Sequence, residues 1–242
     1  MRPASVVGPF RRLRGMFVSN VFVLDGGPGD RFVVDTGHRL ERAALLAGLG
    51  ALPFSPRELT GVLVTHHHSD HAGNAAYMRA TFDVPILAHA ADAEILSGRV
   101  EAPRLVGRSV DPLARAFATI ENLTTTRAPV DRALEDGETI GSLEVHHAPG
   151  HTRGSVLFRH AGTSSLLSGD ALLAAVPPLT LVQRMCLPHP DYAVSHAQAL
   201  ASLRAFHRAG WAFENLLAGH GRPILGGARE RMARLLGENG VE

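Results

Sequence analysis

The stretch VTHHHSDHAGN contains four histidines and one aspartate within six consecutive positions. Neutral imidazole nitrogens and carboxylate oxygens are ligands that Zn²⁺ and similar divalent cations take in proteins. In an extended backbone His66 and His68 point the same way, so both can bind one cation, while His67 points away from them. Asp70 and His71 lie where the chain turns into a helix, and they can face a second, neighbouring cation. The pattern therefore predicts a metal-binding site.

Three further polar residues follow predicted buried strands at the point where each strand ends. They are His151 in APGH, Asp170 in LLSGD and His220 in LLAGH. Side chains at strand ends are held rigidly enough to build a site. His151 can complete the ligands of the first cation and His220 those of the second, and the Asp170 carboxylate can bridge the two. Because no cysteine belongs to this group, we expect a catalytic site with an open position rather than a closed structural zinc site.

The motifs THHHSDH, PGHTRGS, SGD and AGHG resemble, in order and spacing, the motif series of the metallo-β-lactamase-fold hydrolases. The resemblance runs from about residue 15 to residue 226. It implies an α/β (α+β) fold, a four-layer αβ/βα sandwich of two facing mixed sheets with outer helices. The aspartate of VVDTG, Asp35, resembles one that supports the family's site through a ligand, and a plain turn residue is the alternative. The resemblance implies seven metal ligands in two sites: His66, His68 and His151 in the first, Asp70, His71 and His220 in the second, and Asp170 shared.

The stretches PGHTRGSVLF and SGDALL most resemble the glyoxalase II-like branch of that family. This resemblance implies a metallo-hydrolase whose dinuclear centre activates water to cleave a small thioester, ester or lactone. Asp70 and Asp170 would be catalytic, orienting the water and carrying its proton. The cofactors would be two divalent metal ions, with Zn²⁺ favoured and Fe or Mn as alternatives. Glyoxalase II itself has a basic C-terminal helical extension for glutathione; residues 221–242 are short for one and contain no lysine, so the acyl and leaving groups stay open.

Other functions stay open at this point. A mono-iron persulfide (sulfur) dioxygenase on the same fold would use the first-site histidines and Asp170, or a subset of them. A β-lactamase is a further alternative. A phosphodiesterase of the RNase Z type is disfavoured by the net charge of +1 and the lack of a long basic arm. A non-enzymatic binding domain is disfavoured because all seven ligand positions are filled.

The composition predicts a globular protein that acts on a small molecule. With 242 residues, 45% of them hydrophobic, residues 1–242 are expected to form a single domain. The near-neutral charge and the lack of an apolar run of about 18 residues predict no nucleic-acid partner and no membrane segment. Every basic residue is arginine, which excludes a Schiff-base lysine and a P-loop. The lone Cys186 and an N-terminus without an apolar signal core predict a cytoplasmic location, and a homodimer is left open.

Hydrophobic periodicity predicts strands and helices that alternate in both halves of the chain. Residues 171–210 are predicted to form a lid or a wall of the substrate site, and the arginine-rich stretch 11–14 a solvated face. The predicted strands are 17–24, 31–35, 61–65, 84–89, 139–148, 155–160, 164–170 and 215–221. The predicted helices are 38–50, 71–82, 91–98, 111–120, 191–210 and 228–236.

Overall fold

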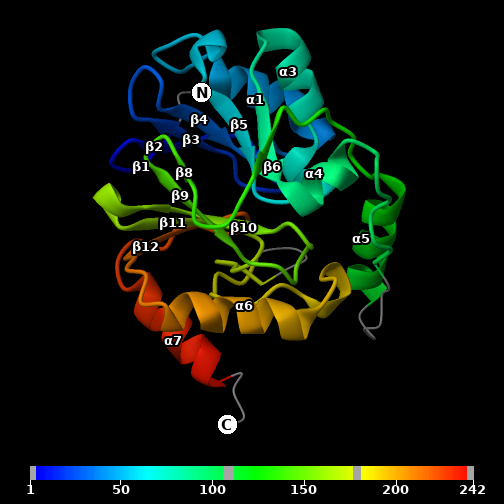
Figure 1. Ribbon diagram of the computed structural model, residues 1–242, viewed down its shortest axis with the longest axis vertical. Helices are drawn as coiled ribbons and strands as arrows, with labels where there is room; N and C mark the ends of the chain where they lie inside the picture. The colour runs from blue at the N-terminus through cyan, green and yellow to red at the C-terminus, as the bar shows by residue number, and fades with distance from the viewer. Residues whose placement is uncertain (1–3, 106–111, 177–180, 239–242) are drawn as a thin grey trace.

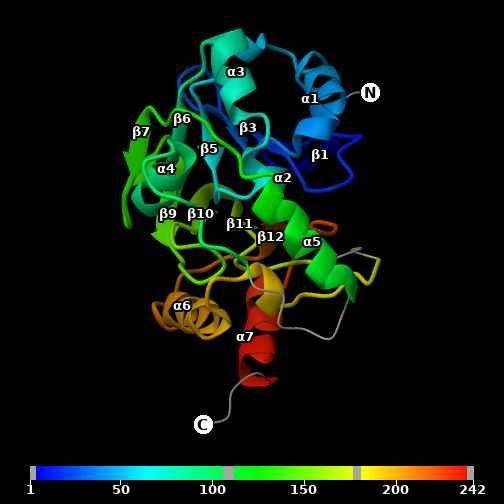
Figure 2. The ribbon, with the colours of Figure 1, turned by 90° about the vertical axis from the view of Figure 1, so that its right-hand side faces the viewer.

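The computed structural model describes residues 4–105, 112–176 and 181–238. Two mixed β-sheets lie face to face, and helices cover the outer face of each sheet (Figures 1 and 2). This is the four-layer αβ/βα sandwich that the sequence predicts, so that prediction is confirmed. Within the described ranges, no helix is both long enough and apolar enough to cross a lipid bilayer.

The first sheet contains seven strands that lie side by side in chain order. The strands from β1 to β4 pair antiparallel, and those from β4 to β7 pair parallel. The strand β5, with the sequence GVLV, is buried at every position, as expected for a strand covered on both faces. The strands are β1 (Ala4–Val7), β2 (Phe10–Arg12), β3 (Phe22–Asp25), β4 (Arg31–Val34), β5 (Gly61–Val64), β6 (Ile86–His89) and β7 (Arg132–Leu134).

The second sheet contains five strands in the order β12-β11-β10-β9-β8. The pair β11 and β12 is parallel, and the other neighbours are antiparallel. A parallel pair needs a long crossover, and here the crossover contains the longest helix of this half of the chain. The strands are β8 (Thr139–Ile140), β9 (Leu143–His147), β10 (Val156–His160), β11 (Ser165–Gly169) and β12 (Asn215–Ala218).

The helices lie outside the sheets. Those named α1, α3 and α4 lie on the side of the first sheet, and α6 and α7 lie on the side of the second (Figure 1). The helix α5 runs past the sandwich from α2 toward the second half of the molecule (Figure 2). The α-helices are α1 (Arg42–Leu49), α2 (Ser69–Ala72), α3 (Ala75–Phe82), α4 (Ala90–Leu96), α5 (Pro112–Leu123), α6 (His196–Arg208) and α7 (Ala228–Glu238). Short 3₁₀ helices are η1 (Arg39–Glu41), η2 (Pro56–Glu58), η3 (Ala161–Thr163) and η4 (Pro190–Tyr192).

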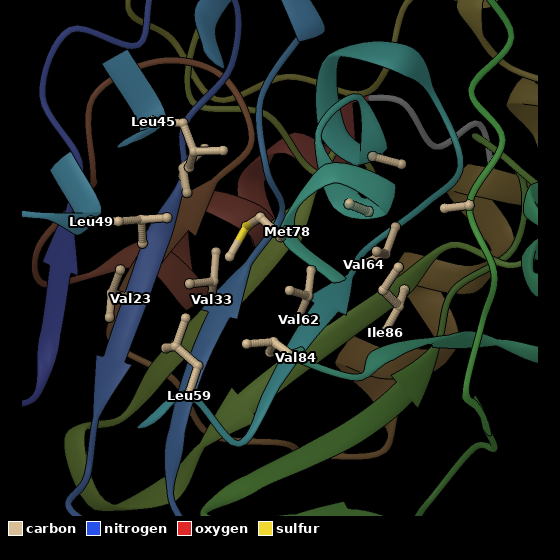
Figure 3. Close-up of a cluster of buried hydrophobic side chains, with 14 of the residues drawn as sticks. Val23, Val33, Leu45, Leu49, Leu59, Val62, Val64, Met78, Val84 and Ile86 are labelled. Atoms are coloured by element: carbon tan, nitrogen blue, oxygen red, sulfur yellow. The ribbon is translucent and has the colours of Figure 1, made fainter. Parts of the chain in front are cut away.

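Buried hydrophobic clusters separate the four layers. In the cluster on the first sheet, Leu45 of α1 and Met78 of α3 pack with the valines of the strands (Figure 3). A second cluster lies between the two sheets and contains Phe32 of one sheet and Phe158 of the other. A third joins the second sheet to α6 and α7. Each fully buried apolar side chain contributes about 1.5–3 kcal/mol, so the shared middle cluster holds the two sheets in a fixed relation.

One predicted helix is interrupted by an asparagine. The helix expected over 71–82 is two helices, α2 and α3, separated by Gly73 and Asn74. The Asn74 amide donates hydrogen bonds to three carbonyl oxygens of the segment 36–38, at 2.9, 3.3 and 3.1 Å. The Asn74 side chain thus connects the residues between α2 and α3 to the segment that follows β4. Hydrophobic periodicity in the sequence does not predict this contact.

Two predicted elements begin later than expected. The helix predicted over 191–210 begins at His196, because the side chain of Ser195 caps its N-terminus. The strand predicted over 17–24 begins at Phe22, which leaves the preceding residues free to reach across the molecule.

The strands β1, β2 and β7 were not predicted. Arginine fills two of the three positions of β2, which hides it from a search for apolar runs. The expectation of a solvated face over 11–14 is therefore wrong in part. Leu13 is buried, Arg12 is half-buried, and Arg14 alone of the four is exposed.

Candidate metal centre

The seven sequence-predicted site residues lie in one cluster where four strands end. Four of them follow β5, and one each follows β9, β11 and β12. One nitrogen or oxygen atom from each residue lies within 4.8 Å of the others in its group. The three overlapping groups are His66 with His68 and His151, His66 with His71 and Asp170, and Asp70 with His71 and His220.

The group formed by His66, His68 and His151 is buried and uncharged. His66 Nε2 and His151 Nε2 lie 3.1 Å apart, and the His68 ring centroid lies 4.8 Å from that of His66 and 4.6 Å from that of His151. Burial, together with the neighbouring His67, lowers the pKa of His68 to about 3. Burial and the neighbouring His68 lower the pKa of His151 to about 3. Neutral imidazole, with a free lone pair, is the form in which histidine binds a metal.

The group formed by Asp70, His71 and His220 carries charges, and Asp170 lies against it. His220 Nε2 lies 3.2 Å from Asp70 Oδ2 and 3.3 Å from Asp170 Oδ2. His71 Nε2 lies 3.2 Å from Asp170 Oδ1. Burial opposes a charged imidazole, but the Asp170 and Asp70 carboxylates together outweigh it and raise the pKa of His220 to about 10. Burial likewise opposes a charged Asp170, yet His220 and His71 hold the pKa of its carboxyl well below the ordinary range.

The donor set of this cluster fits divalent cations. His71 Nε2 and Asp170 Oδ1 are buried 3.2 Å apart, and within the described residues neither has the geometry of a hydrogen bond. A buried polar atom without such a bond costs about 1–3 kcal/mol, which coordination to a cation would remove. A Cβ at Gly219 would lie 2.5 Å from Asp170 Oδ1 and 2.5 Å from His71 Cε1, so only glycine lets the chain before His220 pass this close.

Asp35, at the end of β4, makes the supporting contact that the sequence left open. Its Oδ2 accepts a hydrogen bond from His71 Nδ1 at 2.7 Å, and its Oδ1 accepts one from the Thr65 amide at 2.8 Å. The backbone of Asp35 has φ 61°, in the left-handed region that aspartate tolerates better than most residues. The bond to Nδ1 orients the His71 ring so that Nε2 faces the cluster.

Asp92, at the start of α4, is a functional residue that the sequence did not reveal. Its carboxylate is fully buried and joins the two loops that carry the histidines. Oδ2 accepts hydrogen bonds from the His67 amide and from Thr152 Oγ1, both at 2.8 Å, and lies 3.1 Å from His67 Nδ1. Oδ1 accepts the Gly154 amide at 2.7 Å. His67 therefore points away from the cluster, as expected, and its ring meets Asp92.

Glu121, near the end of α5, was also missed. It accepts hydrogen bonds from the Ser69 amide at 2.9 Å and from Ser69 Oγ at 2.6 Å. Ser69 begins α2, the short helix that carries Asp70 and His71, so Glu121 supplies acceptors to its unpaired N-terminal groups. Figure 2 shows the resulting approach of α5 to α2. The only sequence signal is an acid one position beyond the helix predicted over 111–120, which is too common to single out.

The loop between β2 and β3 reaches the cluster from the other side. The Asn20 amide side chain donates to the carbonyl oxygens of Ala218 at 2.8 Å and Gly221 at 2.7 Å. The hydroxyl of Ser19 donates to the carbonyl oxygen of Asp70. These bonds tie the segments around Asp70 and His220 to one loop, and they explain why this stretch is not part of β3.

The segment 171–210, predicted as a lid or wall, divides into parts with different environments. Leu172 and Leu173 are buried, and Leu172 belongs to the core beneath the second sheet, so its apolar character is structural. Leu181 and Val182 are exposed. Residues 177–180 lie outside the described residues. A wall formed by the remaining part of the segment stays a prediction.

A family model of the metallo-beta-lactamase superfamily matches residues 14–209. The chain belongs to the metallo-β-lactamase superfamily. It is similar to the probable metallo-hydrolase YybB of Bacillus subtilis, with 29% identity over 154 residues, 64% of this chain and 61% of that protein. It is also similar to hydroxyacylglutathione hydrolase of Pseudomonas syringae, with 34% identity over 133 residues, 52% of this chain and 39% of that protein. These matches span less than two thirds of the relatives' own length.

Solved structures with the same fold include subclass B3 metallo-β-lactamase BJP-1 of Bradyrhizobium japonicum. The superposition of the two structures has a TM-score of 0.69 at 18% sequence identity, and it covers 99% of this chain and 92% of that one. A metallo-β-lactamase family protein of Thermus thermophilus, TTHA1429, has a TM-score of 0.66 at 24% identity, covering 96% of this chain and 79% of that one. These likenesses show the fold. Family membership supports a hydrolase, and the histidine and aspartate cluster fits divalent metal binding.

Proposed function

We propose that the protein is a metal-dependent hydrolase of small esters, thioesters or lactones, with two divalent cations, Zn²⁺ favoured, at the seven clustered residues. The observation that carries the proposal is the overlap of the three ligand groups: His66 belongs to the first two, His71 belongs to the last two, and the middle group adds Asp170. Two neighbouring cations need a shared carboxylate to offset their repulsion, and Asp170 lies against both histidine groups. The similarity to hydroxyacylglutathione hydrolase supports a thioester in particular.

Different residues of the chain would bind the metal ions and act on the attacking water in such a reaction. Divalent cations held by these residues would supply Lewis acidity, which would lower the pKa of water and polarise a substrate carbonyl. His66, His68 and His151 are the ligands of one site because burial keeps His68 and His151 neutral. Asp70 and Asp170 carry carboxylate oxygens within 3.3 Å of His220 Nε2, where they can orient an attacking water and accept its proton.

We further propose that residues 1–242 form one domain, because the cluster between the sheets takes side chains from both halves of the chain. The exposed Leu181 and Val182, in the segment 171–210, would form a wall beside the site. A cytoplasmic location remains part of the proposal and rests on the lone Cys186 of the sequence.

The test joins a metal analysis to a substrate panel. Metal content of the purified protein is measured, and turnover is assayed with S-lactoylglutathione, a homoserine lactone, nitrocefin, a phosphodiester and, by oxygen uptake, a persulfide. The proposal expects two divalent metal ions per chain and turnover of the thioester or the lactone. One iron per chain with oxygen uptake would establish the dioxygenase alternative instead. Turnover of nitrocefin alone or of the phosphodiester alone would overturn the substrate class.

A matched pair of variants separates the site from the rest of the fold. His68→Ala removes a clustered histidine, and His207→Ala removes one on α6 that lies outside all three ligand groups. Loss of bound metal and of turnover in the first variant alone supports the proposal. Equal behaviour of the two variants contradicts it.

A further inference from the structure

A cavity of about 220 Å³ is lined by His220 of the ligand cluster and by residues outside that cluster. The loop between β2 and β3 forms one wall, with Phe17 and Val18, and the segment that follows His220 forms another, with Arg222. Arg12 of β2 also lines it. The cavity therefore adjoins the proposed reaction centre and is large enough for a small organic group.

The cavity holds positive charge that no acid of the described chain neutralises. The neighbouring Arg11 and Arg31 both pair with Asp25, at 3.7 and 3.2 Å. Arg12 and Arg222, in contrast, form no ion pair within residues 4–105, 112–176 and 181–238. Arg12 is half-buried, and its contact is a hydrogen bond of 3.4 Å from Nη1 to Asn20 Oδ1.

The two guanidinium groups are close enough to repel each other. Partial burial, followed by the charges of Arg222 and then Arg14, lowers the pKa of Arg12. A guanidinium stays protonated at neutral pH in spite of such a shift, so the repulsion persists in the protein without ligand. Partial burial of the Arg12 charge and its repulsion by the exposed Arg222 are both unfavourable, and an anion bound by the two groups offsets that cost. The planar guanidinium fork matches the oxygens of carboxylate and phosphate groups.

We propose that this cavity is an oxyanion subsite, in which Arg12 and Arg222 bind a carboxylate or phosphate group of the substrate. The inference rests on the proposed function and narrows it: the ester or thioester carries an anionic group within reach of a reaction centre at His220. The exposed side chains of Phe17 and Val18, at 87% and 41%, would contact the apolar part of the same group. Lysine is absent from the chain, so arginine is the only side chain here that is positively charged at every physiological pH.

Binding of unreactive amides tests the subsite without any turnover. The probes are glutaranilic acid, its uncharged carboxamide counterpart and its phosphonate counterpart, titrated calorimetrically into the purified, metal-loaded protein. We expect at least one of the two anions to bind about tenfold more tightly than the carboxamide, the low end for a hydrogen bond to a charged group. Whichever anion binds more tightly identifies carboxylate or phosphate as the natural group. Equal binding of all three probes overturns the proposal.

Variants decide whether these arginines cause the preference. Arg222→Gln changes an exposed side chain and is expected to fold normally, and Arg12→Lys keeps the charge of a half-buried one while removing its fork. Both are expected to reduce the preference for the anion severalfold. Arg208→Gln, at the exposed end of α6, is the matched control and should leave the preference unchanged. Arg12→Gln removes both the charge and the fork of Arg12. A preference that persists in Arg222→Gln and in Arg12→Gln would arise at the metal ions and would overturn the proposal.

Turnover of two matched esters separates this inference from the proposed function. They are the 4-nitrophenyl half-ester of glutaric acid and the corresponding uncharged carboxamide ester. The inference expects a lower KM for the half-ester, and a selective rise of that KM in Arg222→Gln with a smaller change in kcat. Hydrolysis of both esters with equal KM refutes the subsite and leaves the hydrolase intact. Arginine-dependent binding of the amides, without hydrolysis of either ester or of the thioester and lactone of the substrate panel, refutes the hydrolase and leaves the subsite.

Discussion

Replacing Asp92 by asparagine is expected to destabilise the protein, although it changes no residue of the metal cluster. The two Asp92 oxygens accept hydrogen bonds from three donors, the His67 amide, Thr152 Oγ1 and the Gly154 amide. An asparagine of the same shape has one acceptor oxygen, and its NH₂ group must face either Gly154 or the other two donors. At least one buried donor is then unsatisfied, which costs about 1–3 kcal/mol.

The ionisation of Asp92, which depends on the same contacts, gives a figure of the same size. Burial opposes the charge, but His67 and the hydrogen bonds from His67 and Thr152 outweigh it and lower the pKa from 3.8 to about 2. A shift of this size stabilises the folded protein by about 2 kcal/mol at neutral pH. Because the folded pKa is the lower one, this stabilisation is complete above the ordinary pKa and is lost as the pH falls toward 2.

Urea unfolding at pH 7 measures the free energy of unfolding, and the bound metal is measured on the same samples. We expect Asp92→Asn to lose about 2 kcal/mol, and also to bind metal about 10–100-fold more weakly because both histidine loops lose their common anchor. Glu94→Gln is the matched control, since Glu94 lies on the same helix but forms a surface ion pair with Arg99 at 2.8 Å. An Asp92→Asn protein that unfolds with the same free energy as wild type and the control would refute this reasoning.

Three further predictions address the metal, the site and its support. Dialysis against a chelator should abolish turnover and lower Tm, and added Zn²⁺ should restore both; an unchanged Tm in calorimetry would argue against structural coupling of the metal. Asp170→Ala should lose turnover and bound metal while far-ultraviolet circular dichroism stays that of wild type, and a retained kcat would contradict the assignment. Glu121→Gln should weaken the contact of α5 with Ser69 and speed proteolysis within 112–123; wild-type cleavage rates would show that the contact does not hold α5.

The site residues that could be predicted from the sequence belong to short local patterns. An apolar run followed at once by histidine or aspartate predicts both a buried strand and the side chain at its end, as with β5 and His66. The resemblance to a known family then orders these separate strand ends around one centre. The same runs predicted sheets covered by helices, because each alternating strand and helix needs a partner layer to cover its apolar face. The four-layer sandwich itself was implied by the resemblance to the family.

The missed parts depend on contacts between distant segments. Asp92 meets Thr152 across 60 positions, and Glu121 meets Ser69 across 52, so no window of sequence contains both partners. Asn20 lies in the stretch 17–24, which the sequence predicts as a strand. It hydrogen-bonds instead to the carbonyl oxygens of Ala218 and Gly221, and the strand begins after it. In each case a tertiary contact overrides the local preference, and the residue type alone gives no warning.

The most direct test of the metal centre is a crystal structure of the protein grown with excess zinc, with the metal located from anomalous diffraction at the zinc edge. We predict two peaks for each chain, one among His66, His68 and His151 and one among Asp70, His71 and His220, with Asp170 between them. Absence of anomalous density among these seven side chains, or zinc bound only elsewhere, would contradict the account.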